Sequence, residues 1–406
     1  MFAGNQKRRG SIQWIVDLLL AVGLVAVLAV VIAIDRGRPA EKAASKQPTQ
    51  LKVVETPPEE PTPPVKTLRL GVTPPPFDHP FDDMGRLLDE LGEGYKYAKF
   101  PLDDLRDGKK ISEYDVIFLT CSGVPKSWLA ESIGASQREG LELFFPNKEV
   151  IAEVANNLRE FVAGGGTLYA SDRHYNLVAG AFEKLAPQPA PNGKKQDLNA
   201  DVVDPGLREL IGGEFALRFD QADWCPAAFE GEQVVVYLRG TYEPLEGEPR
   251  PTPLLVKFPF EKGTVIFTSF HNEKQNSEAE LKLLRYLVFS AVTAEVETKV
   301  RQSMVKGGFS PAKNNLFSAS AGAEEASSVY KAAKTCDLKF TLGFEDLGAR
   351  LKLTVVGPDG APREQEGTST FTVDVPGAAA GDWKYTVTAL KVPNENFPFT
   401  VTVGEK

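Results

Sequence analysis

Residues 156–172, which read NNLREFVAGGGTLYASD, constrain the fold more strongly than any other stretch of the chain. Their first half carries apolar residues at the helical period, and three glycines follow, where positive φ ends many helices. A short apolar run at 167–170 then predicts a buried strand, which ends in the small polar residues Ser171 and Asp172. A helix that turns directly into a buried strand is typical of a doubly wound α/β sheet, in which ligands bind beyond the carboxyl ends of the strands.

Two other continuous apolar runs have the same character. Residues 115–120 (DVIFLT) and 263–269 (GTVIFTS) indicate strands that are covered on both faces. A helical pattern at 277–291 follows the second run, and alternation of strands with helices predicts βαβ units with right-handed crossovers. We therefore expect residues 67–295 to form an α/β domain with a flavodoxin-like, doubly wound, mostly parallel sheet.

Three segments, YDVIFLTCSG, LREFVAGGGTLYASD and GTVIFTSFHNE, resemble the class I glutamine amidotransferase-like superfamily, especially its trehalose-utilisation (ThuA-like) branch. The resemblance covers residues 66–292 and implies a flavodoxin-like sheet. Members of that superfamily often carry a nucleophilic cysteine on a tight turn after the strand that matches 167–170. A His-x-Glu pair orients their cysteine, and His271 and Glu273 match that pair.

The tight turn departs from the superfamily pattern. The matching place, 170–172, reads Ala-Ser-Asp and holds no cysteine. A nucleophile turn also needs small residues two positions to either side, and those positions around Ser171 hold Tyr169 and Arg173. The turn therefore argues against amidotransferase activity.

Several polar residues follow predicted strands and are candidates for a site in the crevice. His271 and Glu273 suit a general base held by a carboxylate, and Cys121 is a candidate nucleophile if a base lies beside it. The candidate ligand-binding residues are Ser171, Asp172 and Ser122. Each candidate also has a structural interpretation: the histidine and the glutamate bond backbone groups, the thiol is buried and inert, and the polar residues cap the next helix.

Composition and charge exclude several classes of function. The net charge of −9 argues against nucleic acid as a partner, because phosphate binding needs a basic face. The three cysteines are too few for a disulfide framework, and the sequence does not pair them. An acidic cluster at 78–83 matches no known metal-binding loop, and acids at a helix N-terminus explain it. We therefore predict no metal and no cofactor.

The N-terminal residues predict a membrane anchor. Residues 18–34 form an uninterrupted apolar run that spans about 25 Å as a helix, and residues 12–16 extend it to bilayer thickness. We expect a cytoplasmic head at 1–11, a transmembrane signal-anchor at 12–34 and a Pro-rich tether at 35–66. A cleaved signal peptide is the alternative interpretation of this run. Basic residues in the head favour a single-pass protein of the cell membrane with the bulk of the chain extracytoplasmic.

The C-terminal region changes character. Residues 296–334 mix small and polar residues and are predicted to be a linker, whereas short alternating strands with Gly and Pro turns predict a β-sandwich at 335–406. The run LKLTVVGPDG and the strand GDWKYTVTAL resemble the bacterial pre-peptidase C-terminal type of sandwich. That resemblance implies an accessory or binding module.

These observations favour a noncatalytic binding or scaffolding protein at the cell envelope, with an envelope protein or a carbohydrate as its partner. The missing cysteine, the tether and the accessory-type sandwich support this interpretation. The alternative is a hydrolase or sugar-modifying enzyme that uses His271 and Glu273, together with Cys121 or Asp172. A structure with Cys121, Asp172 and His271 within hydrogen-bonding distance of one another would favour the enzyme.

Overall fold

The computed structural model describes residues 68–74, 82–99, 101–121, 125–128, 147–271, 278–320, 324–345 and 348–406. The predicted head, transmembrane segment and tether at 1–66 lie outside these ranges. No helix within the described ranges is both long enough and apolar enough to cross a lipid bilayer. All the elements described below belong to one compact unit, Pro63–Lys406.

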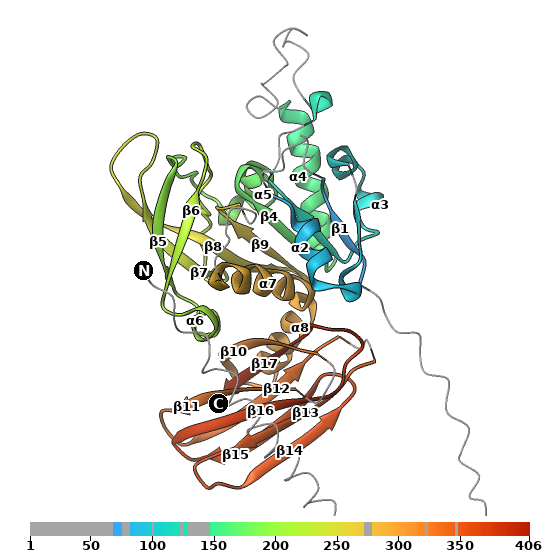
Figure 1. Cartoon of the computed structure of the whole chain (residues 1–406), viewed down its shortest axis with the longest axis vertical. Coiled ribbons are helices and arrows are strands. Elements are labelled where there is room, and N and C mark those ends of the chain that lie inside the picture. The colour runs from blue at the N-terminus through green and yellow to red at the C-terminus, as the bar shows by residue number, and fades with distance from the viewer. Residues whose placement is uncertain are drawn as a thin grey trace, which may run out of the picture. The chain divides into compact units, whose positions relative to one another are not determined.

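The described residues contain a nine-stranded mixed sheet with the strand order β2-β1-β3-β4-β9-β8-β7-β5-β6 (Figure 1). One half is parallel and has the strand order of a flavodoxin-like fold. Its strands are β2 (Tyr97–Lys99), β1 (Leu70–Val72), β3 (Val116–Leu119), β4 (Thr167–Ser171) and β9 (Gly263–Thr268). An antiparallel half, which the sequence did not predict as such, extends the sheet. Its strands are β8 (Arg250–Phe260), β7 (Val235–Tyr242), β5 (Gln196–Val202) and β6 (Glu214–Phe219).

Helices cover both faces of this sheet, so the α/β prediction of a doubly wound fold is confirmed (Figure 1). Alternate residues of a strand point to opposite faces. Phe118 and Tyr169 accordingly enter the core beneath α2 and α7, whereas Ile117 and Leu168 enter the core beneath α4 and α5. The helices are α2 (Met84–Leu91), α3 (Gly108–Ile111), α4 (Lys148–Ala163), α5 (Tyr175–Ala181), α6 (Pro205–Ile211) and α7 (Glu278–Val292).

Two four-stranded antiparallel sheets form a C-terminal sandwich, as the sequence predicted. Facing side chains make one core around Phe340, Trp383 and Tyr385, each at most 2% exposed. The first sheet has the order β10 (Ser310–Ala319), β17 (Phe397–Glu405), β12 (Cys336–Gly343) and β15 (Phe371–Ala378). The second has the order β11 (Glu325–Ala332), β16 (Gly381–Lys391), β13 (Arg350–Val356) and β14 (Pro362–Gly367).

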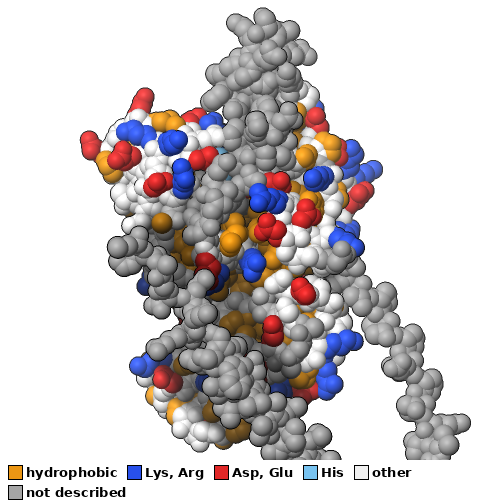
Figure 2. Space-filling model, in the orientation of Figure 1, with side chains coloured by type: hydrophobic (Ala, Val, Ile, Leu, Met, Phe, Trp, Pro, Cys, Tyr) orange, Lys and Arg blue, Asp and Glu red, His pale blue; other side chains and the backbone are white. Residues whose placement is uncertain are grey.

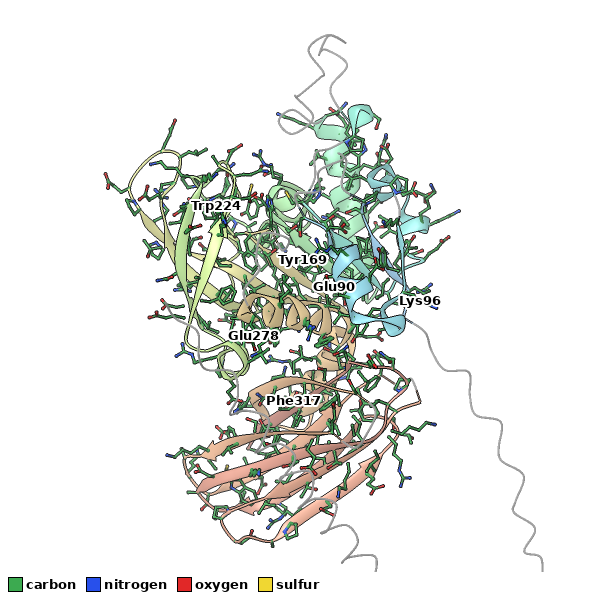
Figure 3. The ribbon with its side chains drawn as sticks, viewed as in Figure 1. Glu90, Lys96, Tyr169, Trp224, Glu278 and Phe317 are labelled. Atoms are coloured by element: carbon green, nitrogen blue, oxygen red, sulfur yellow. The ribbon has the colours of Figure 1, made fainter. Side chains whose placement is uncertain are left out.

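The range that was expected to be a linker, 296–334, is instead structured, which corrects that expectation. It contains most of α8 (Ala294–Lys306) and the strands β10 and β11. Each of these strands lies at the edge of its sheet and carries polar residues at exposed positions, so neither has a strong apolar signal. Figure 3 labels Phe317, a β10 side chain that packs against the sandwich core.

Helix α8 connects the main sheet to the sandwich. It contacts β9 on one side and β10, β12 and β17 on the other. Lys257 on β8 donates a hydrogen bond to Glu297 of α8 at 2.6 Å, and both residues are buried. The hydroxyl of Tyr95, in the α/β part, donates a hydrogen bond of 2.7 Å to the backbone carbonyl of Asn396, in the sandwich. These two residues are 301 positions apart in the sequence. The two parts therefore share contacts at several places.

The described surface visible in Figure 2 mixes basic and acidic side chains. Lys and Arg alternate with Asp and Glu over this face rather than gathering in one stripe. Among the described residues on this face there is thus no extended basic surface of the kind that binds a phosphate backbone.

Candidate functional site

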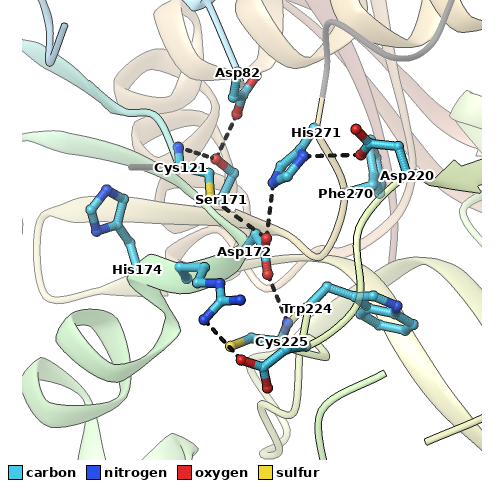
Figure 4. A network of polar contacts seen from close by, with 12 residues as sticks. Asp82, Cys121, Ser171, Asp172, His174, Asp220, Trp224, Cys225, Phe270 and His271 are labelled. Carbon is cyan, nitrogen blue, oxygen red and sulfur yellow. Dashed lines mark hydrogen bonds and ion pairs between the residues drawn. The ribbon is translucent and has the colours of Figure 1, made fainter. Parts of the chain in front are cut away.

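Three side chains converge at the carboxyl edge of the parallel strands (Figure 4). Cys121 follows β3, Asp172 follows β4 and His271 follows β9, and these three strands are neighbours in the sheet. Asp172 Oδ2 accepts a hydrogen bond from Cys121 Sγ at 3.5 Å and lies 2.9 Å from His271 Nε2. The three residues are between 2% and 6% exposed. The sequence predicted each as a separate candidate, and the fold brings them together.

A second carboxylate contacts the opposite side of the imidazole ring. Asp220 directly follows β6, and its Oδ1 lies 3.3 Å from His271 Nδ1. The ring therefore lies between two carboxylates, those of Asp172 and Asp220. Sequence reasoning missed Asp220, because β6 was not recognised as a strand and no motif surrounds it.

The backbone turns at Asp172, one residue later than the comparison with amidotransferases indicated. Asp172 has a φ of +43°, in the left-handed region that few residues other than glycine adopt. Such a conformation costs on the order of 1 kcal/mol and occurs preferentially at functional sites. Ala170 lies two positions before the turn, and the buried His174 lies two positions after it. His174 Nε2 is 2.8 Å from the carbonyl oxygen of Thr120. An aspartate thus occupies the turn at which the resemblance implies a nucleophilic cysteine.

Hydrogen bonds from β4 and from two segments outside the strands fix the cluster. Ser171 Oγ accepts from the backbone N–H of Cys121 at 2.9 Å and donates to Asp82 Oδ2 at 2.6 Å. The backbone N–H of Cys225 donates to Asp172 Oδ1 at 2.7 Å, which leaves Oδ2 toward the other two side chains. Ser171 is 0% exposed and its hydroxyl positions Cys121, and its predicted role in ligand binding stays a prediction.

Burial and charge set the protonation of the cluster. Burial and the neighbouring Asp172 carboxylate raise the pKa of Cys121 to about 11, so the group is a thiol near neutral pH. Burial lowers the pKa of His271, but hydrogen bonds to Asp172 and Asp220 more than offset this and hold it well above 6.5. Burial lowers the pKa of His174 to about 4, so that ring is neutral. His271 is therefore the charged imidazole of the site, and Cys121 alone is a weak nucleophile.

Two of the predicted site residues lie outside the part of the chain that the structure describes. Glu273 and Ser122 lie outside the described residues, so the pairing of His271 with Glu273 stays a prediction. Cys121, Cys225 and Cys336 are all free and buried. His271 does have carboxylate partners among the described residues, but they are Asp172 and Asp220.

Comparisons with known proteins yield similarities at low identity. No family model and no curated protein matches the chain. A solved structure described as a GMP synthase subunit from Thermoplasma acidophilum is 12% identical, with a TM-score of 0.34 over 60% of this chain and 98% of that one. A glutamine amidotransferase from Thermotoga maritima is 12% identical, with a TM-score of 0.30 over 60% and 94%. A cytoplasmic protein from Salmonella typhimurium LT2 is 15% identical, with a TM-score of 0.33 over 55% and 96%. These similarities at low identity assign no activity and no site residue to this chain.

Proposed function

We propose that the α/β part of this chain is a hydrolase whose reaction takes place at Cys121, Asp172 and His271. One observation carries the proposal: the reactive atoms of all three residues meet at the carboxyl edge of adjacent parallel strands. Open α/β sheets bind their ligands at this edge. The left-handed backbone of Asp172 supports the same interpretation, because strained conformations occur preferentially at functional sites.

The chemistry of the cluster favours hydrolysis over a purely structural role. Hydrolysis requires groups that bind and polarise a water molecule beside the bond to be cleaved. Asp172 Oδ2 and His271 Nε2 are two such groups, and Asp220 keeps the ring in its orientation. The enzyme alternative from the sequence is therefore preferred to the noncatalytic one, with Asp172 and Asp220 as the carboxylates that act with His271.

Activity measurements on variants test this proposal. The full chain is assayed against chromogenic esters, amides and glycosides, and the best substrate is used for kinetics. His271→Ala and Asp172→Asn should each lower kcat by about 100-fold or more, because general acid–base groups contribute that much. Cys336→Ser, a buried thiol of the sandwich, is the matched control and should retain full activity. A His271→Ala variant as active as the unmodified chain would refute the proposal.

We also propose that the chain is anchored in the cell membrane by residues 12–34, with the α/β part and the sandwich outside the cytoplasm. The apolar run and the Pro-rich tether that follows it support this topology. The sandwich would then bind an envelope protein or a carbohydrate near the hydrolase. Protease added to intact cells should digest the folded parts and leave a short protected fragment. Recovery of the full-length chain in the soluble cytoplasmic fraction would contradict the topology.

A further inference from the structure

We propose that Cys121 Sγ, Asp172 Oδ2 and His271 Nε2 together bind one divalent transition-metal ion of the zinc class. The three atoms lie within 4.8 Å of one another and come from three different strand ends. The sequence predicted no metal, because the acidic cluster at 78–83 matches no metal-binding loop and the three histidines are too few for a histidine-rich centre. The catalytic role of the ion rests on the proposed hydrolase function, but its binding stands on the geometry alone.

The distances fit tetrahedral coordination. Zinc lies about 2.3 Å from sulfur and about 2.1 Å from oxygen, so a tetrahedral site separates these two ligands by about 3.6 Å. Cys121 Sγ and Asp172 Oδ2 are 3.5 Å apart. The same geometry separates nitrogen and oxygen ligands by about 3.4 Å. His271 Nε2 and Asp172 Oδ2 are 2.9 Å apart, so a movement of about 0.5 Å admits the ion.

Asp220 supplies the outer contact that histidine ligands of metals usually have. A metal-bound imidazole commonly donates its second N–H to a carboxylate, which fixes the ring and increases its basicity. Asp220 Oδ1 lies 3.3 Å from His271 Nδ1 and can accept that proton. Nε2 lies 2.9 Å from Asp172 Oδ2, and an ion bound between these two atoms would take the place of the proton that they share.

The charge of the buried cluster accommodates a dication. When Cys121 Sγ and His271 Nε2 both donate to Asp172 Oδ2, the three groups share two protons. Because metal ligands bind in their deprotonated forms, a dication would replace both protons. The net charge of the cluster would not change, so the exchange adds no charge to the protein interior.

The ligand types select the kind of metal. Thiolate and imidazole favour zinc and related transition metals, whereas magnesium and calcium prefer oxygen ligands. Three protein ligands leave a fourth position for water, as in catalytic zinc sites. Zinc lowers the pKa of such a water to about 7, which supplies the nucleophile that hydrolysis needs.

The ligands are also held in place before any ion binds. The N–H of Cys121 is fixed by Ser171, whose hydroxyl bonds Asp82. The backbone N–H of Cys225 donates a hydrogen bond to Asp172 Oδ1, which leaves Oδ2 directed toward the proposed ion. Ligands on rigid strand ends lose little freedom on binding, which favours affinity.

Titration of the metal-free full chain with Co²⁺ tests binding without any substrate. A cobalt–thiolate bond gives a charge-transfer absorption band, and we expect one equivalent of Co²⁺ that Zn²⁺ displaces. Cys121→Ser should abolish the band, whereas the matched controls Cys225→Ser and Cys336→Ser should keep it. Asp220→Asn should weaken affinity by about 10- to 100-fold, the usual effect of losing an outer contact.

Each outcome decides between the proposals. The absence of the band from the unmodified chain, or its persistence in Cys121→Ser, overturns the metal site. Circular dichroism establishes that Cys121→Ser is folded, and the graded loss in Asp220→Asn provides a second, independent measurement. If the metal-free chain hydrolyses its substrate at the full rate, the catalytic role of the ion is overturned while the hydrolase proposal stands. If the cobalt site forms but nothing in the substrate panel is cleaved, the metal site stands and the hydrolase proposal fails.

Discussion

The buried ion pair between Lys257 and Glu297 should make the junction of the main sheet with α8 sensitive to the loss of either partner alone. The two side chains are 9% and 10% exposed and their charged atoms are 2.6 Å apart. Lys257→Met would leave the Glu297 carboxylate buried without its main partner, which costs about 3–5 kcal/mol. Arg301 lies 3.4 Å from Glu297 but is 45% exposed, so it offsets only part of this loss. We therefore expect a loss of about 3 kcal/mol in the free energy of unfolding.

Urea denaturation of matched variants measures this loss. The double variant Lys257→Met/Glu297→Leu removes both charges and fills a similar volume, so it should lie within about 1 kcal/mol of the unmodified chain. The single variant should be much less stable than the double one, although it differs from the unmodified chain by fewer changes. If the single variant unfolds within about 0.5 kcal/mol of the unmodified chain, the reasoning from buried charge is wrong.

The ion pair between Lys257 and Glu297 should also make the free energy of unfolding depend on pH. Burial raises the pKa of Glu297, but Lys257 and Arg301 outweigh burial and lower it below the ordinary value of 4.5. A carboxylate with a lowered folded pKa contributes stability that is complete above its unfolded pKa. That contribution is lost as the pH falls through the folded pKa. The double variant should lack this acid-dependent loss, and an unchanged acid profile in the double variant would contradict the assignment.

Two further predictions follow from the site and from the packing beneath it. Because the pKa of Cys121 is raised to about 11, its alkylation by iodoacetamide in the native metal-free chain should be slow at about pH 8 and should accelerate about tenfold per pH unit; a rate independent of pH would contradict this. Gly263→Ala should lower the free energy of unfolding by about 1–3 kcal/mol, since overpacking costs that much. Its added methyl would lie 2.2 Å from the carbonyl oxygen of Val162, whereas the control Gly213→Ala meets nothing closer than 3.8 Å. Equal melting temperatures for these two glycine variants would refute the packing argument.

The central strands of the parallel half could be predicted because they are buried on both faces. β3, β4 and β9 are continuous apolar runs with every residue buried, and such runs are distinct in a sequence. β5 and β6 alternate exposed polar residues with more buried ones, and β5 follows a polar stretch that contains prolines. Their exposed faces weaken the apolar signal, so the antiparallel arrangement became evident only from the pairing of the strands.

The site could be predicted in part for the same reason. Cys121, Asp172 and His271 were candidates because each follows a strand that the apolar pattern had identified. Asp220 could not be found in this way, since its strand was not recognised. The location of the turn at Asp172 rather than Ser171 depends on a backbone angle, for which a non-glycine sequence gives no direct signal.

The position of β9 has a consequence for how the chain emerges from the ribosome. β9 lies between β4 and β8 inside the main sheet, yet Thr268 follows its hydrogen-bond partner Tyr169 by 99 positions. Throughout the synthesis of the intervening segment, β4 of the nascent chain is an open edge, and open edges pair readily with other polypeptides. His271 of the candidate site is translated only three residues after this strand. A pause in translation before that point would therefore prolong the period in which this site is incomplete and the nascent chain depends most on chaperones.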